Sequence, residues 1–243
     1  MRIDVTKNGP YRVTGHVPMA RQIIETDDAG TPVRWVQGEE YPVSGEYYVC
    51  RCGKSANKPF CDGTHKQCGF DGTETASREP YLAQADEFDG PEVALFDAPD
   101  LCSYARFCDA NGQIWNLAEV PGAADEVRGQ AGDCPSGRLQ AWDLRAQLPV
   151  EPDLPPSIGV VSDPALGVAG PLWVRGRVPV TAADGTEYEV RNRMTLCRCG
   201  ASWNKPFCDG SHAATGFQDT RPGSTGQEVP RPRRADDTRR PVS

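Results

Sequence analysis

Short strand-like runs, each bounded by glycine or proline, recur near both ends of the chain. The stretch Gly9–Pro18 has this form, and Gly170–Pro179 repeats it. Two more runs, Glu46–Val49 and Arg193–Leu196, also have the apolar and aromatic content of strands. Glycine and proline at the ends of such runs are typical of strand boundaries. The pattern therefore predicts two small β-rich units.

The segment between these units, about residues 76–148, has a mixed pattern. Val93–Phe96 and Arg138–Trp142 are predicted strands. Asp100–Cys108 is predicted to be a short helix, and Gly122–Gly132 has helical composition. Strands and helices are both predicted here, and we expect an α+β fold in a loop-rich chain.

The two β-rich units share a pattern of cysteines and one histidine. Residues 50–65 and residues 197–212 both have the form Cys-Arg-Cys-Gly-x-Ser-x-Asn-Lys-Pro-Phe-Cys-Asp-Gly-x-His. Each copy supplies three thiols and one imidazole at fixed spacing. The candidate ligands are Cys50, Cys52, Cys61 and His65 in the first copy, and Cys197, Cys199, Cys208 and His212 in the second.

Thiolates are soft ligands that suit iron–sulfur clusters or zinc. The Cys-x-Cys pair can share one iron, and Cys61 and His65 are one helical turn apart, so they can share another. Structural zinc also accepts Cys₃His, although its cysteine pairs are usually spaced by two to four residues, which disfavours zinc here. Ser55 and Ser202 could donate hydrogen bonds to a cluster.

The repeated pattern resembles the CDGSH iron–sulfur family, also called the NEET family; the first copy has Thr64 where the family name has serine. The resemblance implies one [2Fe–2S] cluster on the four ligands of each copy. It also implies small β-rich units that often work in pairs, so that two copies in one chain could form a pseudo-dimer.

One histidine among three thiolates has consequences for redox chemistry. Replacing a thiolate by neutral imidazole removes negative charge and raises the reduction potential, as in Rieske centres. An exposed ligand histidine can also take a proton near neutral pH. We therefore expect proton-coupled reduction, and cluster loss in acid, through His65 and His212.

Three further cysteines lie in the middle segment. Cys102, Cys108 and Cys134, the last followed by proline, resemble the ligands of a divergent single-cluster ferredoxin-like domain. Ala105 stands where the second cysteine of the usual C-x₂-C-x₂-C run would be. Three thiolates suit a [3Fe–4S] cluster, or a [4Fe–4S] cluster whose fourth ligand is water, hydroxide or a side chain, for which the candidates are Asp97, Asp100 and Asp109. The alternative is three cysteines that only pack.

Composition and charge narrow the function. The net charge of −8 argues against nucleic-acid binding, which needs a basic surface. No apolar run approaches the roughly 20 residues of a membrane span, and the start lacks an apolar signal-peptide core, so we expect a cytoplasmic location. Reduced cytosolic thiols also favour metal ligation over disulfides for the 10 cysteines. Cys68 is the cysteine left over, and it is predicted to be a free thiol.

We thus expect a unit over residues 1–75, a ferredoxin-like domain over 76–149, a second unit over 150–222 and a disordered Arg/Pro-rich tail over 223–243. The predicted function is electron transfer by a monomer containing a pseudo-dimer, between a reductase and an oxidase or oxygenase. We find no arrangement of acid–base or nucleophilic residues in the sequence that would indicate an enzyme, so we expect an electron carrier. The alternatives are cluster transfer or redox and iron sensing, and a structural zinc scaffold.

Overall fold

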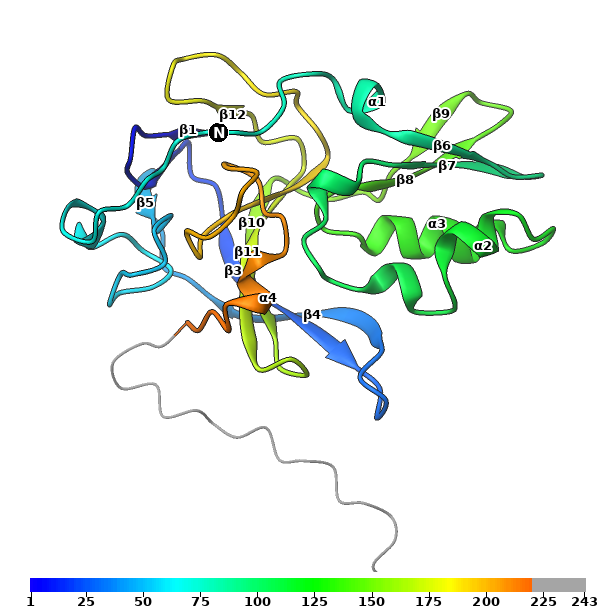
Figure 1. The fold of residues 1–243 in the computed structure, drawn as a ribbon, viewed down its shortest axis with the longest axis horizontal. Coiled ribbons are helices and arrows are strands. Elements are labelled where there is room, and N and C mark those ends of the chain that lie inside the picture. Colours follow the sequence, from blue (N-terminus) through cyan, green and yellow to red (C-terminus); the bar gives the residue numbers. More distant parts are fainter. Residues whose placement is uncertain (220–243) are drawn as a thin grey trace, which may run out of the picture.

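The computed structural model describes residues 1–219, so the tail predicted over 223–243 lies outside the described residues (Figure 1). The first repeat is built around a four-stranded sheet of order β12-β1-β2-β5. Its strands are β1 (Arg2–Val5), β2 (Tyr11–Thr14), β5 (Glu46–Val49) and β12 (Val180–Thr181). The strands β1, β2 and β5 are antiparallel neighbours, whereas β12 joins β1 in parallel.

The second repeat is built around a five-stranded sheet of order β13-β11-β10-β3-β4. Its strands are β3 (Met19–Thr26), β4 (Pro32–Glu40), β10 (Ser157–Asp163), β11 (Val168–Arg175) and β13 (Arg193–Leu196). The strands β3 and β4 pair as an antiparallel hairpin at one edge of this sheet.

The two sheets exchange equivalent strands. In the first repeat β2 leads through Val17 and Pro18 into β3, and in the second β11 leads through Val178 and Pro179 into β12. Each of these strands leaves its own repeat and pairs in parallel with the other one: β3 with β10, and β12 with β1. The registers correspond, since Met19 pairs with Ile158 and Val180 pairs with Ile3. The two copies are therefore intertwined.

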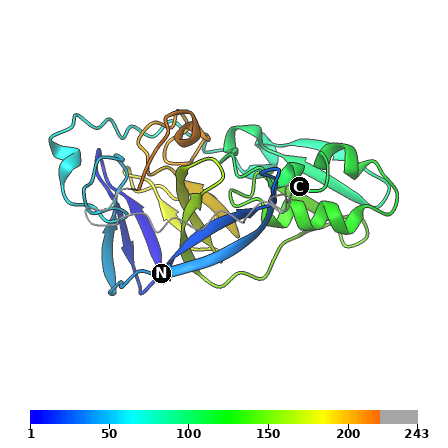
Figure 2. The same cartoon turned by 90° about the horizontal axis from the view of Figure 1, so that it is seen from below.

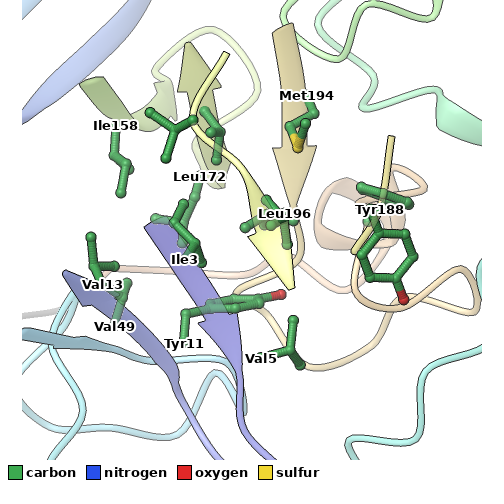
Figure 3. Packing of buried hydrophobic residues seen from close by; sticks show 14 of the residues in the cluster. Ile3, Val5, Tyr11, Val13, Val49, Ile158, Leu172, Tyr188, Met194 and Leu196 are labelled. Atoms are coloured by element: carbon green, nitrogen blue, oxygen red, sulfur yellow. The ribbon is translucent and has the colours of Figure 1, made fainter. Parts of the chain in front are cut away.

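One apolar core serves both repeats. Its fully buried members include Ile3 and Val13 of the first repeat and Ile158, Leu172 and Leu196 of the second. Figure 3 shows these side chains packed against one another between the strands. Neither repeat could bury this surface alone, so the stability of each depends on the other.

The middle segment forms a separate two-layer α+β domain. An antiparallel sheet of order β6-β7-β8-β9 carries two helices on one face (Figure 1). Its elements are α1 (Tyr81–Gln84), β6 (Asp86–Asp89), β7 (Val93–Asp97), α2 (Ile114–Ala118), α3 (Ala124–Asp133), β8 (Leu139–Asp143) and β9 (Leu148–Val150). The strands predicted at 93–96 and 138–142 and the helix at 122–132 are confirmed.

The helix predicted over Asp100–Cys108 is wrong. Two single 3₁₀ turns, Pro99–Leu101 and Phe107–Asp109, flank an irregular loop. Within it Tyr104 and Arg106 have φ values of 58° and 66°, a left-handed conformation that cannot continue a right-handed helix. The loop wraps around the middle cysteines.

The middle domain lies at one end of the molecule, beside the five-stranded sheet (Figures 1 and 2). Arg193 of β13 is 1% exposed and joins the two parts. Its guanidinium donates to the carbonyl oxygens of Gly132 at 3.2 Å and Cys134 at 2.7 Å, at the end of α3, and pairs with Glu151 at 2.7 Å. A buried cation thus satisfies carbonyls that the helix itself cannot.

Replacing Arg193 by methionine should lower the free energy of unfolding by about 3 kcal/mol, because removing one partner of a buried ion pair strands the other. Urea denaturation followed by circular dichroism measures the change. The control is Arg12→Met, which breaks the exposed pair with Glu46 at 2.7 Å and should cost much less, because exposed ion pairs contribute little to stability. Equal losses in the two variants would contradict the role given to Arg193.

Candidate metal centres

The first ligand loop follows β5 and returns to it through a bridge between Val49 and Phe60. Cys50 and Cys52 lie at the start of the loop, with their sulfurs 3.8 Å apart. Cys61 and His65 lie at its end, where Gly63 (φ 90°) leads into the 3₁₀ turn η1 (Thr64–Lys66). The Cys61 sulfur is 3.4 Å from Nδ1 of His65.

The second loop repeats this arrangement after β13. The sulfurs of Cys197 and Cys199 are 3.6 Å apart. Cys208 and His212 are brought together by the helical turn α4 (Ser211–Ala214), with 3.4 Å between the Cys208 sulfur and Nδ1 of His212. The helical turn expected near each histidine is therefore confirmed.

These distances fit metal ligation in pairs. Two groups that bind one tetrahedral metal at about 2.0–2.3 Å lie roughly 3.5–3.8 Å apart. Within residues 1–219 no three His, Cys, Asp or Glu side chains gather around a position for a single ion. Each loop offers its four candidate ligands as two close pairs.

One sulfur of each Cys-x-Cys pair is prepared for metal binding. The hydrogen bond from Cys52 lowers the pKa of Cys50 to about 6, against the opposing effect of burial. In the second loop Cys199 lowers the pKa of Cys197 to about 6 in the same way. One thiolate of each pair is therefore available at neutral pH, and thiolate is the form that binds metal.

The serines of both loops brace the backbone. Ser55 donates to the carbonyl of Phe60 at 2.7 Å and accepts from the backbone N–H of Asn57 at 3.0 Å. Ser202 makes the equivalent bond to Phe207 at 2.7 Å. These hydroxyls thus donate to carbonyls, whereas the sequence suggested that they donate to a cluster.

The two loops meet backbone to backbone. A Cβ atom placed on Gly200 would lie 2.6 Å from the carbonyl oxygen of Cys52, and one on Gly53 would collide with the carbonyl of Cys199. Both glycines also have positive φ, 83° and 73°. Only glycine allows this approach, which brings the Cys-x-Cys pairs of the two loops side by side. A cavity of about 570 Å³ opens beside the contact, lined by both Cys52 and Cys199.

The three middle cysteines also come together. Cys102, Cys108 and Cys134 line one cavity, and Ala105 lines it where a fourth cysteine is missing. Arg138 lines the same cavity, held by Asp97 at 2.5 Å.

Of the candidate fourth ligands, Asp97 is committed to Arg138 and to the indole N–H of Trp115 at 3.0 Å. Neither Asp100 nor Asp109 is among the residues that line the cavity. Three thiols and two arginines, Arg106 and Arg138, line it.

Comparison with protein-family models identifies all three regions. The model for the iron-binding zinc finger of CDGSH type matches residues 8–66 and 169–213. The model for the divergent 4Fe-4S mono-cluster matches residues 88–144. The chain is an iron–sulfur protein with tandem CDGSH regions. A comparison with curated proteins found no match. The three matched ranges lie inside the expected units 1–75, 76–149 and 150–222, whose boundaries stay predictions.

The arginine inside each CDGSH motif is a buried structural residue of the site that the sequence reasoning missed. Arg51 and Arg198 lie between the two cysteines of each pair and are only 1% and 2% exposed. Arg51 donates to the carbonyl of Thr6 at 2.9 Å, and Arg198 donates to that of Gly170 at 2.8 Å. Both stack on a phenylalanine that closes the repeat, Phe70 or Phe217. The repetition of arginine in both copies was the available signal.

The two CDGSH sites are not equivalent. Cys208 and His212 are 2% and 5% exposed, whereas Cys61 and His65 are partly exposed. Burial, followed by the charge of Arg198, lowers the pKa of His212 to about 4. The expectation of an exposed ligand histidine therefore suits the first site and fails for the second.

A tyrosine adds to this difference. Tyr11 of the first repeat is fully buried, and its hydroxyl lies 2.7 Å from the carbonyl oxygen of Cys197 and 3.0 Å from that of Pro206. The corresponding residue of the second repeat is Leu172, which has no hydroxyl. The first repeat thus holds the second CDGSH loop by a bond that has no counterpart in the first loop.

Two side chains of the loops differ sharply in exposure. Trp203 in the second loop is 87% exposed. Lys58 in the first loop is 8% exposed, and its ammonium donates to the carbonyl of Ser55 at 2.7 Å. Lys58 therefore braces the first loop from inside.

Cys68 is exposed and aligns with Thr215 of the second repeat, so its thiol should be dispensable. We expect Cys68→Ser to keep the iron content of the unaltered protein, and Cys61→Ser to lose the iron of the first site. Iron quantitation after anaerobic purification gives the comparison. Iron loss in Cys68→Ser would mean that Cys68 is a ligand.

Proposed function

We propose that this iron–sulfur protein is an electron carrier with two [2Fe–2S] clusters and a third cluster of the [4Fe–4S] or [3Fe–4S] type. The observation that carries the proposal is the division of each CDGSH ligand set into two pairs at 3.4–3.8 Å. A [2Fe–2S] cluster needs two protein ligands on each of its two irons.

The proposed ligands of the two CDGSH sites divide by their position in the loop. The Cys-x-Cys pair of each loop would hold one iron and the cysteine–histidine pair the other. The ligands are Cys50, Cys52, Cys61 and His65 for the first site and Cys197, Cys199, Cys208 and His212 for the second. When bound, each cluster supplies one-electron redox chemistry.

Other residues set the surroundings of these ligands. Neutral imidazole in place of a thiolate makes each CDGSH site less negative, which favours the reduced state. Lys205 approaches the second Cys-x-Cys pair, and its charge favours the Cys197 thiolate. Arg51 and Arg198 fix the backbone between the two thiolates. These residues hold the ligands in place, and a fixed ligand set limits reorganisation when an electron arrives.

The third cluster would be held by Cys102, Cys108 and Cys134. The match to the divergent 4Fe-4S model supports a [4Fe–4S] cluster. Ala105, which stands where a fourth cysteine would be, instead suits a [3Fe–4S] cluster, because a fourth iron would have no cysteine ligand. Arg138 offsets the thiolate charge in the cavity. The Ser136 hydroxyl lies 3.5 Å from the Cys134 sulfur and can tune the potential by hydrogen bonding.

The proposed partners are a reductase and an oxidase or oxygenase, met in the cytoplasm by a monomer whose two CDGSH halves form a pseudo-dimer. Reciprocal strand pairing within one chain supports the pseudo-dimer. No helix among residues 1–219 is long and apolar enough to cross a membrane.

Anaerobic purification with iron, sulfide and zinc quantitation, followed by EPR before and after dithionite, tests the proposal. We expect iron and sulfide without stoichiometric zinc, and new signals on reduction. An EPR signal in the oxidised protein would indicate [3Fe–4S] in the middle domain, and its absence would indicate either [4Fe–4S] or no cluster there. A colourless protein that contains zinc alone would overturn the proposal.

A second candidate function is cluster transfer or redox and iron sensing. The partial exposure of Cys61 and His65 favours it, because an accessible ligand pair can release its iron to a partner. Incubation with an apo-ferredoxin distinguishes the two functions. Transfer of iron that depends on oxidation state supports cluster transfer, whereas electron exchange without loss of iron supports the carrier.

A further inference from the structure

The middle domain lies directly against the ligand turn of the second CDGSH site. A Cβ atom placed on Gly210 would lie 3.2 Å from Cβ of Tyr104 and 3.4 Å from the carbonyl oxygen of Cys102. Gly210 lies between the proposed ligands Cys208 and His212, and Cys102 is itself a proposed ligand of the middle centre. The ligand segments of the two centres are therefore in van der Waals contact.

Polar contacts fix this position at both ends of the Cys102–Tyr104 loop. On one side, the side-chain amide of Asn204 donates to the carbonyl of Asp100 at 2.7 Å. On the other side, Arg106 pairs with Asp163 of β10 at 2.5 Å, and the Asp163 side chain is only 4% exposed. A buried ion pair of this kind needs a defined geometry, so it fixes the loop in register with the second repeat.

Apolar packing supports the same junction. Phe107, Trp35 and Trp173 stack at 5.1 Å and 4.7 Å between ring centres, joining the middle loop, the β3–β4 hairpin and β11. The indole N–H of Trp35 also donates to the carbonyl of Asp133 at 3.0 Å. Aromatic contacts of this kind add to the burial of the surfaces that they join. The middle domain is therefore docked firmly on the second site.

The first CDGSH site has a different environment. Within the described part of the chain, nothing lies within 4 Å of a Cβ atom placed on Gly63, the counterpart of Gly210. Asn57, the counterpart of Asn204, is exposed, and Cys61 and His65 are partly exposed. The first site meets the second through its Cys-x-Cys pair, so its cysteine–histidine pair faces outward.

Resting on the proposed function, we infer that the second CDGSH site and the middle centre form one coupled redox pair across the Cys102–Tyr104 and Asp209–Gly210 contact. The first CDGSH site is one end of the series, and its partly exposed cysteine–histidine pair can meet external partners. One electron lost by one centre at this junction is gained by the other, with no further reactant. The second site occupies the middle place because the two Cys-x-Cys loops touch on its other side.

EPR of the dithionite-reduced full chain tests the order. Two matched variants each remove a ligand from one CDGSH site, Cys208→Ala at the second and Cys61→Ala at the first. Magnetic coupling to a neighbouring reduced centre broadens the signal of the middle centre and speeds its relaxation. We expect this broadening to be lost in Cys208→Ala and retained in Cys61→Ala. Loss in Cys61→Ala, or retention in both, would overturn the order.

The unaltered protein provides a second measurement that does not depend on the folding of a variant. Limited treatment with an iron chelator should empty the more exposed first site first, and the broadening of the middle-centre signal should persist. Its disappearance with the first iron released would contradict the inference. Iron and sulfide quantitation on the same samples distinguishes failure of the proposed function from failure of the inferred junction. A protein without iron and sulfide contradicts the proposed function, whereas a loaded protein whose middle centre is uncoupled contradicts only the junction.

Discussion

Reciprocal pairing of β3 with β10 and of β12 with β1 is the constraint on which the rest of the molecule depends. Each repeat supplies a strand that completes the sheet of the other, and the two share one apolar core. This pairing holds β5 and β13, the strands that lead into the ligand loops, in a fixed relation. The backbone contact between the two Cys-x-Cys pairs follows from it.

The intertwined halves have nevertheless become different. Tyr11 holds the second ligand loop, while Leu172 at the corresponding place packs in the core. The β3–β4 hairpin extends only the second sheet, and Trp35 on it contacts the middle domain. A single chain can place different residues at equivalent positions, which a symmetric homodimer cannot do. These differences accompany the burial of the second cysteine–histidine pair and the partial exposure of the first.

Local features of the fold could be predicted from the sequence, and non-local ones could not. The Cys-x-Cys and cysteine–histidine spacings fix ligand geometry within a few residues, so both ligand loops were predictable. Alternation of apolar and polar residues indicates a strand but does not identify the strand it pairs with. The exchange of β3 and β12 between the two sheets therefore could not be predicted from the sequence.

The burial of charged residues was also unpredictable, because it depends on distant segments of the chain. Arg51, Arg193 and Arg198 would ordinarily be placed at the surface, yet all are buried against backbone carbonyls supplied by distant segments. The 100–108 segment has helical composition, but its cysteines must turn towards one cavity, and this tertiary requirement overrides local propensity.

Linking both CDGSH halves through the middle domain has a consequence for how the protein behaves at low abundance. In a homodimer, the pairing of two such sites is a bimolecular equilibrium, so the dimer dissociates on dilution. Here the partner strand is always present at an effective concentration set by the chain itself. The spacing between the two sites is therefore independent of how many copies of the protein a cell contains.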